Sequence, residues 1–391
     1  MNIVIAGRFS PPVLACMRSW GRNGHRVGFI HFDDGGSRWI ASKYLNQYTS
    51  VPLRMMGKTD GITGIKDFLE TFDADILSCV DDNMMCWLDD HKSVFEPDVS
   101  LALPPLDMVK QILSKTYQNQ IASDVGFQVL PEFIISPENK SSISIPSTYF
   151  PICLRPSEAH DVTPFFKVKL IESSKMLKRF LQGIQINNSG AIIAQPFKNL
   201  PNLVVHGIRT TAGDTKRLSG FIVERKFEGV TLTLKPYKQI DTHLINKCAQ
   251  FVQSAELTGN FHFEFLLDPT SGAAFFLEIN HRFGGTTAKA LACGYDEPLY
   301  ALEAHGIVKS CTVSPLVHTT VSNKQALLKY IIKAITGKLT LLDHPTAHPF
   351  RQCMAGLNGL LFHADEVIAF DDLTGSISLY ANNFLNAVKG T

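Results

Sequence analysis

The stretch FHFEFLLDPTSGAAFFLEINHRFGG, residues 261–285, carries the strongest fold signal in the chain. Two apolar runs, Phe261–Leu267 and Ala273–Asn280, flank the turn-forming sequence Asp-Pro-Thr-Ser-Gly. Apolar runs of this length bounded by turn residues predict two strands joined as a hairpin. Working outward from this hairpin gives the organisation of the whole chain.

Polar side chains gather on one face of the predicted hairpin. Alternation gives the first strand a phenylalanine face and a second face that carries His262 and Glu264. A turn centred near residue 271 puts Glu264 directly across from the second strand's carboxylate. Alternation places four residues together on this face of the second strand and just beyond it: Phe276, Glu278, Asn280 and Arg282.

Two adjacent carboxylates, Glu264 and Glu278, repel each other unless a proton or a cation lies between them. Carboxylate and amide oxygens suit hard cations, and magnesium takes one or two protein carboxylates together with substrate phosphates. Arg282 adds a forked donor for phosphate or carboxylate. Gly284-Gly285-Thr286 leads into a predicted helix, whose N-terminus would suit an anion. A solvent-facing polar strand face with a surface salt bridge explains the same alternation equally well.

The residues before position 104 alternate between strand-like and helix-like segments. Ile3–Ala6, Arg26–Phe32 and Asp75–Val80 are predicted strands, and Pro11–Trp20 and Gly61–Phe72 are predicted helices. This alternation predicts a parallel sheet covered by helices on both faces. The first turn supplies one glycine where a dinucleotide-binding turn needs several, so a nicotinamide site is not favoured.

The middle of the chain changes to an antiparallel pattern. Helices are predicted over 106–125, 172–184 and 243–257, with a polar loop over 136–148 and a strand at Pro151–Pro156. Three strands separated by short polar turns then predict an antiparallel sheet. A helix is expected from about Thr286 and another at Lys324–Ile335, before a small mixed α/β segment. The three strands are Ala191–Phe197, Leu203–Thr210 and Leu218–Phe227.

The composition of the 391 residues limits the function classes. Lys and Arg total 37 and Asp and Glu 36, so a general attraction to nucleic acid or to an anionic membrane is not indicated. The apolar runs are too short to cross a bilayer, and the apolar run at the N-terminus is too short for the core of a signal peptide. The eight cysteines form neither a CxxC pair nor a cluster with histidine, which excludes a sequence-recognisable zinc site or disulfide framework. We expect a cytoplasmic enzyme.

Glu278-x-Asn280-x-Arg282 with the following glycines, preceded by a strand that carries Glu264, resembles the metal-binding motif of the ATP-grasp superfamily. The order of parts over residues 1 to about 305 is also similar to that family, and especially to its carboxylate–amine ligases, which include carbamoyl-phosphate-synthase-like and D-alanine–D-alanine-ligase-like proteins. The resemblance implies an α/β protein with the ATP-grasp fold. It implies four parts: a Rossmann-like domain (1–103), two ATP-grasp lobes (104–190 and 191–305) and a C-terminal α/β accessory domain (306–391).

The resemblance also implies roles for single residues. Glu264, Glu278 and Asn280 would hold two Mg²⁺ ions, with Mn²⁺ as an alternative, against the phosphates of ATP. Lys115 matches a phosphate-contacting lysine, and Arg282 would stabilise the transferred phosphoryl group. The remaining implied positions are Gln195 and Phe197 at adenine, Arg155 in a strand that usually carries lysine, and Arg225 or Lys226 near the γ-phosphate.

The chain departs from the family pattern in the loop that usually closes over the phosphates. Residues 157–164 contain no glycine and two acids, whereas the family loop is glycine-rich. The acidic residue that often binds the ribose has no clear counterpart, and Asn202 is a poor substitute. His344 and His348 are four residues apart, but the prolines beside them argue against the helix that a histidine metal pair needs.

The resulting hypothesis is an ATP-dependent ligase that activates a carboxylate as an acyl phosphate for attack by an amine, releasing ADP and phosphate. Its partners would be small-molecule carboxylates and amines, and a homodimer is one option. His206, Arg209 and Arg217 are candidates for binding a substrate carboxylate, although structural roles explain each of them better. Two alternatives stay open: a non-catalytic or regulatory nucleotide-binding protein, and a carboxylase-type enzyme that uses ATP and bicarbonate.

Overall fold

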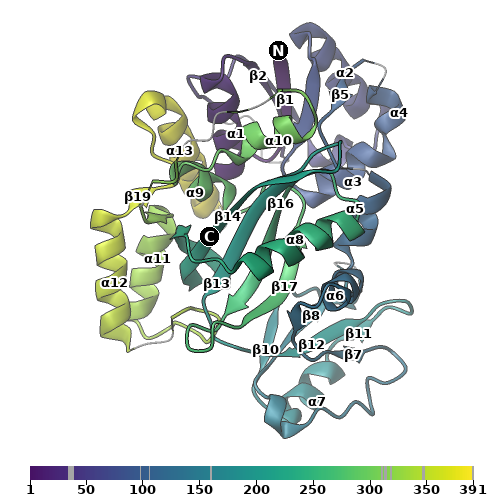
Figure 1. The fold of residues 1–391 in the computed structure, drawn as a ribbon, viewed down its shortest axis with the longest axis vertical. Coiled ribbons are helices and arrows are strands. Elements are labelled where there is room, and N and C mark those ends of the chain that lie inside the picture. The colour runs from purple at the N-terminus through teal and green to yellow at the C-terminus, as the bar shows by residue number, and fades with distance from the viewer. Residues whose placement is uncertain are drawn as a thin grey trace.

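The computed structural model places a parallel sheet at one end of the molecule, a long, mostly antiparallel sheet in the middle and a small lobe at the other end (Figure 1). Within the described ranges, no helix combines the length and the apolar character that a membrane span needs. The structure describes residues 1–33, 39–96, 98–104, 106–158, 161–309, 311, 315–317, 319–345 and 348–389.

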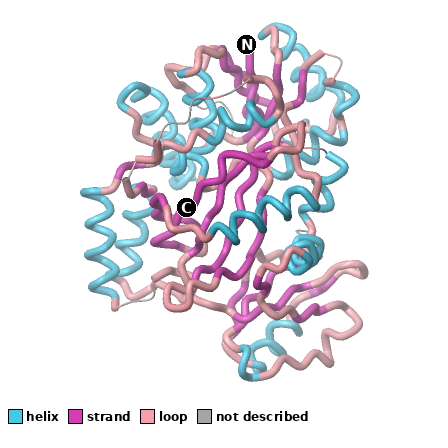
Figure 2. The backbone as a smooth tube through the Cα atoms, in the orientation of Figure 1, coloured by secondary structure: helices cyan, strands magenta, loops and turns pink. Residues whose placement is uncertain are grey.

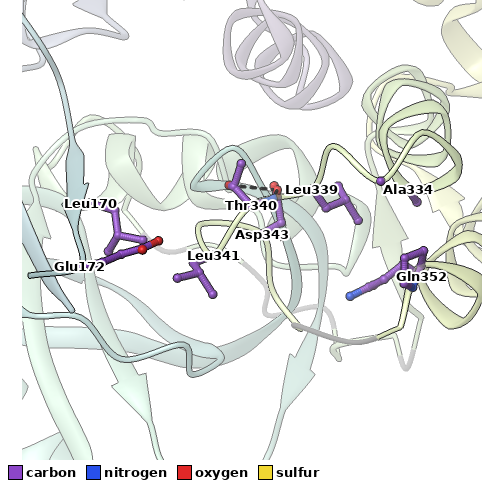
Figure 3. A pocket seen from close by; sticks show the side chains of 10 residues that line it. Leu170, Glu172, Ala334, Leu339, Thr340, Leu341, Asp343 and Gln352 are labelled. Atoms are coloured by element: carbon purple, nitrogen blue, oxygen red, sulfur yellow. Dashed lines mark hydrogen bonds between the residues drawn. The ribbon is translucent and has the colours of Figure 1, made fainter. Parts of the chain in front are cut away.

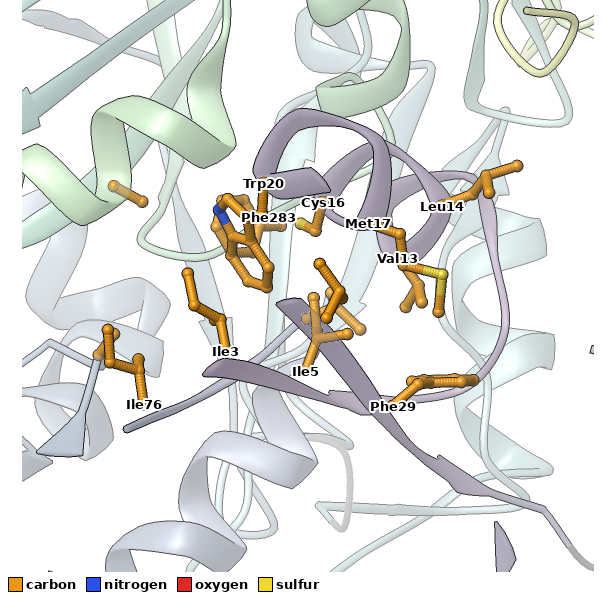
Figure 4. Packing of buried hydrophobic residues seen from close by; sticks show 14 of the residues in the cluster. Ile3, Ile5, Val13, Leu14, Cys16, Met17, Trp20, Phe29, Ile76 and Phe283 are labelled. Carbon is orange, nitrogen blue, oxygen red and sulfur yellow. The ribbon is translucent and has the colours of Figure 1, made fainter. Parts of the chain in front are cut away.

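The N-terminal layer is a five-stranded parallel sheet with the order β3-β2-β1-β4-β5, which confirms the predicted parallel sheet. Apolar residues cover both of its faces, one against α2 and α3 and the other against α1. On the α1 face, Trp20 packs edge-on against Phe283, which follows the second strand of the decisive hairpin (Figure 4). The elements are β1 (Asn2–Gly7), α1 (Pro11–Arg22), β2 (Arg26–Phe32), β3 (Gln47–Val51), α2 (Thr59–Phe72), β4 (Ile76–Cys79), α3 (Asp82–Asp90), α4 (Lys92–Phe95) and β5 (Ser100–Leu101).

A small lobe follows, built on a four-stranded antiparallel sheet with the order β10-β8-β12-β7. Helix α7 covers it through Leu177 and Leu181, which are buried with the apolar side chains of the sheet. The single helix predicted over 106–125 is divided at Ser114, whose hydroxyl caps the N-terminus of α6. The elements are α5 (Leu106–Leu113), α6 (Lys115–Asp124), β7 (Phe133–Ile135), β8 (Ile152–Pro156), β9 (Val162–Thr163), β10 (Lys169–Ile171), α7 (Ser174–Gln182), β11 (Gln185–Ile186) and β12 (Ile192–Pro196).

The central sheet has eight strands in the order β19-β18-β15-β14-β13-β16-β17-β6, and its longest strands run between the N-terminal layer and the small lobe (Figure 2). Helix α8 packs on one face of this sheet over an aromatic core. Strand β15 was not among the predicted strands. The elements are β6 (Gln128–Val129), β13 (Asn202–Arg209), β14 (Thr215–Phe227), β15 (Val230–Tyr237), α8 (Thr242–Ser254), β16 (Gly259–Leu267), β17 (Ala274–Asn280), α9 (Thr287–Ala292), α10 (Glu297–Ala304), β18 (Val321–Ser322) and β19 (Ala364–Asp365).

A bulge in the hairpin formed by β16 and β17 corrects the predicted face of Phe276. Glu264 pairs with Glu278, but the next residue, Phe265, pairs with Phe276, so β17 has one additional residue at this point. An extra residue shifts all later side chains of a strand to the opposite face. Phe276 is therefore fully buried in the aromatic core, stacked on Phe127, and not on the face of Glu278 as alternation predicted.

The C-terminal segment lies against the other parts of the molecule. Its short strands β18 and β19 extend the central sheet, so its strands do not form a sheet of their own. A buried Arg18–Asp372 ion pair, 2.9 Å long, joins it to α1, and a buried Lys289–Glu366 pair, 2.6 Å long, joins it to α9. The predicted domain boundaries at 103, 190 and 305 remain predictions. The helices are α11 (Lys324–Ile335), α12 (Pro349–Phe362) and α13 (Leu373–Lys389).

Candidate active site

Glu264 and Glu278 lie directly across from each other on β16 and β17, as the sequence predicted. The opposite face of β16 is held by Phe261, Phe263 and Phe265 in the core beneath α8. Burial of these phenylalanines decides which face of the hairpin carries the carboxylates. Side chains alternate along a strand, so when the odd-numbered residues of β16 point into this core, the even-numbered ones, including Glu264, point to the other face. Both carboxylates are partly exposed on the face that turns away from α8.

Two cations from separate elements reach Glu278. Lys115, the first residue of α6, places its Nζ 2.6 Å from Glu278 Oε2. Arg155 on β8 of the small lobe places a guanidinium nitrogen 3.8 Å from the same oxygen. Asn280, two residues along β17, donates its Nδ2 to Glu278 Oε1 over 3.2 Å. The structure thus gathers three of the sequence-predicted site residues around the carboxylate of a fourth, Glu278.

The two carboxylates have different electrostatic environments. Burial, and then the charge of Glu278, raise the pKa of Glu264 to about 7. Burial acts in the same direction on Glu278, but Lys115 and Arg155 outweigh it and hold the pKa of Glu278 below its usual range. Glu264 therefore has an unbalanced charge that a hard cation between the carboxylates would neutralise. This donor set of two carboxylates and an amide fits magnesium.

Asn202 links Glu264 to Lys226, and the sequence interpretation did not predict this link. Its Nδ2 donates to Glu264 Oε2 over 3.0 Å, and its Oδ1 accepts from Lys226 Nζ over 3.0 Å. Burial lowers the pKa of Lys226 to about 8. Alternation along β13 could have revealed Asn202, because it lies on the same face of the central sheet as Glu264.

Arg225, the neighbour of Lys226, does not reach this cluster. Its guanidinium donates to Tyr330 Oη over 2.6 Å and to Gln352 Oε1 over 2.7 Å, so it contacts α11 and α12 of the C-terminal segment. Lys226 and Arg225 lie where the pairing of β14 with β15 is irregular, which turns adjacent side chains away from simple alternation.

Gln195 and Phe197 lie at the end of β12, where the chain leaves the small lobe for the central sheet. Gln195 is buried; its Oε1 accepts from Arg155 over 2.7 Å and its Nε2 donates to Glu132 over 2.9 Å. Glu132 also accepts from Asn119 of α6 and was not predicted from the sequence. Phe197 is partly buried, and its backbone N–H donates to the Pro151 carbonyl over 2.8 Å.

Arg282 lies just beyond β17 and contacts the N-terminal layer. Its Nε donates to Asp82 Oδ1 over 2.6 Å, so Asp82 at the start of α3 positions the guanidinium. The Asp82 carboxylate, together with nearby Glu278 and Asp81, raises the pKa of Arg282 although burial acts to lower it. Arg282 therefore stays charged at the junction of the N-terminal layer and the central sheet.

The three polar residues that were candidates for binding a substrate carboxylate are buried or bonded to other parts of the protein. His206 is fully buried, Arg209 donates to the Leu257 carbonyl over 2.9 Å, and Arg217 forms a two-nitrogen contact with Glu303. Thr286 contacts His206, and α9 has six residues, so the expected anion site at that helix start gains no support. The His344 ring contacts Asn199.

Of the glycine-less loop over 157–164, residues 159 and 160 lie outside the described part of the chain. The described part pairs at Val162–Thr163 with β11, so this segment is a strand edge of the small lobe. Asp161 organises the loop, since its carboxylate accepts from the backbone N–H of Glu158 over 2.8 Å and of Ala191 over 3.2 Å. One of the two acids of the loop is thus used to hold the loop itself.

A cavity of about 430 Å³ lies outside the carboxylate cluster, between the small lobe and the C-terminal segment (Figure 3). Leu170 and Glu172 line one side, and Leu341 and Gln352 line the other. Asn199, next to this cavity in the chain segment after β12, donates to the Leu341 carbonyl over 3.0 Å. The C-terminal segment therefore supports the hinge that connects the small lobe to the central sheet.

No protein-family model matches the chain, and no curated protein matches its sequence. Solved structures do match its fold. N5-carboxyaminoimidazole synthetase from Staphylococcus aureus, complexed with ADP, is similar with a TM-score of 0.63 at 13% identity, over 88% of this chain and 86% of that chain. The L-amino acid ligase from Bacillus licheniformis is similar with a TM-score of 0.60 at 13% identity, over 78% and 74%.

Biotin carboxylase from Campylobacter jejuni, in a β,γ-ATP complex, is similar with a TM-score of 0.62 at 14% identity, over 81% of this chain and 73% of that chain. These solved structures are ATP-grasp enzymes. The α/β chain described here therefore has the ATP-grasp fold, as its sequence motif predicted.

Proposed function

We propose that the protein is an ATP-dependent ligase that joins a carboxylate to an amine. The observation that carries the proposal is the paired Glu264 and Glu278 on the central sheet, contacted by Lys115 and Arg155. Carboxylates, an amide and two cations at one point suit a metal-bound polyphosphate. The likeness to ATP- and ADP-bound enzymes of the same fold supports the nucleotide.

Glu264, Glu278 and Asn280 are the residues that would hold magnesium. When bound, Mg²⁺ would neutralise negative charge on the phosphates of ATP and on the transferred group. The pairing of Glu264 with Glu278 supports this assignment, because a bound cation favours the charged form of both carboxylates. Asn202 and Lys226 orient Glu264 from the β13 side.

Lys115 of α6 and Arg155 of β8 would bind the phosphates. Both cations are directed at Glu278. Phosphate oxygens compete for the same donors, and an arginine can bind them through two nitrogens. The Gln195 and Phe197 segment at the end of β12 would contact adenine, with the Phe197 side chain against its ring.

The reaction would proceed in two displacements. A substrate carboxylate oxygen attacks the γ-phosphorus of ATP, and the bond to ADP breaks. The amine then attacks the acyl phosphate carbon, phosphate leaves with the bonding electron pair, and the nitrogen loses its proton. Arg282, held by Asp82, would neutralise charge on the phosphoryl group in both steps, and Lys226 would approach the same group from β14. The substrates would be small molecules in the cytoplasm, and the protein could act as a homodimer.

The test is ADP release measured over a matrix of carboxylates and amines with Mg²⁺. Release that requires one member of each class, and that is lost in Glu278→Gln, supports the ligase. Release with bicarbonate in place of the organic acid supports the carboxylase alternative, which the likeness to biotin carboxylase motivates. ATP binding without ADP release for any pair supports a non-catalytic protein, which the glycine-less loop and the Arg155–Gln195 contact motivate.

A further inference from the structure

A second cluster of metal-ligand type lies beside the carboxylate pair on the same face of the central sheet. His206 on β13 is opposite His262 on β16, and His262 is opposite Asn280 on β17. Helix α10 lies against both β13 and β16 (Figure 1) and adds Glu297. The side chains of His206 and Glu297 are fully buried, and His262 is 3% exposed. No role in the proposed ligase reaction uses these three residues.

The ring nitrogens of this cluster are incompletely paired. His206 Nε2 contacts Thr286 Oγ1 over 3.1 Å, whereas its Nδ1 has no hydrogen-bond partner among the described residues. His262 Nδ1 also lacks a partner in the described part of the chain. Buried polar atoms are nearly always hydrogen-bonded, and an unpaired one costs about 1–3 kcal/mol. Two such atoms in one cluster require an explanation.

The carboxylate of Glu297 is directed at these nitrogens and is held from behind. Asn260 Nδ2 donates to Glu297 Oε1 over 2.9 Å, and Thr287 Oγ1 donates to Glu297 Oε2 over 2.7 Å. Glu297 Oε2 also lies 3.4 Å from His206 Nδ1, without the geometry of a hydrogen bond. A buried carboxylate beside two unpaired imidazole nitrogens is the donor arrangement of a cation site.

We propose that His206 Nδ1, His262 Nδ1 and Glu297 Oε2 bind one divalent transition-metal ion of the zinc class. One ligand atom from each of His206, His262 and Glu297 lies within 4.8 Å of the other two. A tetrahedral ion with bonds of about 2.0–2.1 Å needs ligand atoms roughly 3.4 Å apart, which the His206–Glu297 pair already meets. Imidazole nitrogens favour zinc-class ions over magnesium, so this site is chemically distinct from the carboxylate pair beside it.

The surrounding contacts hold two of the proposed ligands in place. If Thr286 accepts from Nε2–H, His206 is fixed in the tautomer that leaves Nδ1 to bind the metal. Gly284 lies against the ring of His262, where a Cβ would come 2.5 Å from Cε1, so the loop after Arg282 covers the cluster closely. A bound ion would join α10 to the sheet that carries Glu264 and Glu278.

The test is titration of chelator-treated full-length protein with Co²⁺ in excess Mg²⁺ and without nucleotide. We expect one equivalent of Co²⁺ with the strong visible absorption of a low-coordinate nitrogen site, displaced by Zn²⁺. His206→Gln and His262→Gln should each remove the absorption. The matched control is His31→Gln, another buried histidine, on β2 of the N-terminal layer, which should retain it. Glu278→Gln should retain it as well.

A wild-type protein that gives no such absorption overturns the proposal, and so does absorption that survives both histidine variants. If a variant fails to fold, the Co²⁺ form of the wild type still decides. Ligation through Nδ1 leaves each imidazole with an exchangeable Nε2–H, so two strongly shifted exchangeable proton resonances are expected. One such resonance, or none, contradicts the two-histidine site. Because no ATP is present, the outcome is independent of the proposed ligase activity.

Discussion

Lys115 and Glu278, 163 positions apart in the chain, meet with Nζ 2.6 Å from Oε2. This contact brings the first residue of α6 to the strand that carries the proposed metal ligands. The lysine provides positive charge beside Glu278 that a bound cation would also provide. Binding of magnesium and ATP would therefore exchange the partner of Lys115 from a carboxylate to a phosphate.

Replacing Lys115 by methionine should weaken Mg-ATP binding by about tenfold to a hundredfold, since a hydrogen bond to a charged group is worth about 1.5–3 kcal/mol. The measurement is calorimetric titration with a non-hydrolysable ATP analogue. Lys175→Met on the exposed surface of α7 is the control and should bind like the wild type. Unchanged affinity in Lys115→Met would remove this lysine from the phosphate site.

The bulge in β17 makes a stability prediction. Phe276→Ala should lower the free energy of unfolding by about 3–5 kcal/mol, because it deletes a fully buried ring from the aromatic core. Phe275→Ala should cost less than half as much, since Phe275 is partly exposed beside Lys198. Denaturant unfolding measures both. Equal costs, or a larger cost for Phe275, would contradict the register with the bulge.

Two ion pairs between α1 and the C-terminal segment should differ in their contribution to stability. Arg18 is buried and donates to Asp372, to the Val367 carbonyl and to Ser376, so Arg18→Ala leaves buried acceptors unpaired and should cost about 3–5 kcal/mol. Arg22→Ala breaks an exposed pair with Asp371 and should cost about 1 kcal/mol or less. Denaturant unfolding compares the two variants, and similar costs would show that the C-terminal segment is not attached through Arg18.

The hinge contact of His344 predicts a pH dependence of stability. Burial, and then Lys226 and Arg225, lower the pKa of His344 to about 4, against about 6.5 when unfolded. The folded state thus binds fewer protons between these values, and this contribution to stability is present above pH 6.5 and lost as the pH falls towards 4. His344→Gln should remove this part of the acid sensitivity. Unfolding curves measured from pH 7 to pH 4 test it.

The exposed His243 provides the comparison for that experiment. His243→Gln should show the same loss of stability on acidification as the wild type, because other buried histidines remain. The His344→Gln variant should lose less than either protein. Parallel curves for all three proteins would show that protonation of His344 is not coupled to folding.

Much of the fold followed from local patterns. The order of strands and helices in the N-terminal layer and the pairing of Glu264 with Glu278 were predictable because alternation and turn residues act over short distances. The predicted face of Phe276 was wrong, because the bulge depends on packing against Phe127 and not on the strand's own sequence. Strand β15, which pairs along β14, was missed altogether.

The candidate site was partly predictable for the same reason. Glu278, Asn280 and Arg282 lie close together in the sequence, whereas Asn202, Glu132 and Asp82 come from distant segments and meet the site residues only in three dimensions. Arg225 and Lys226 are adjacent in the sequence, yet only Lys226 reaches the Glu264 side. Irregular pairing of their strand decides between them, and no short-range pattern encodes it.

The most direct test of the central claim is thermal unfolding with and without Mg-ATP, for the wild type and for Glu278→Gln. Ligand at a hundred times its dissociation constant adds about 2.7 kcal/mol, which raises the melting temperature by several degrees at most. We predict a shift in the wild type that requires both Mg²⁺ and ATP and that is lost in the variant. No shift in the wild type at millimolar Mg-ATP, or an equal shift in Glu278→Gln, would contradict the assignment of this carboxylate to a nucleotide-bound metal.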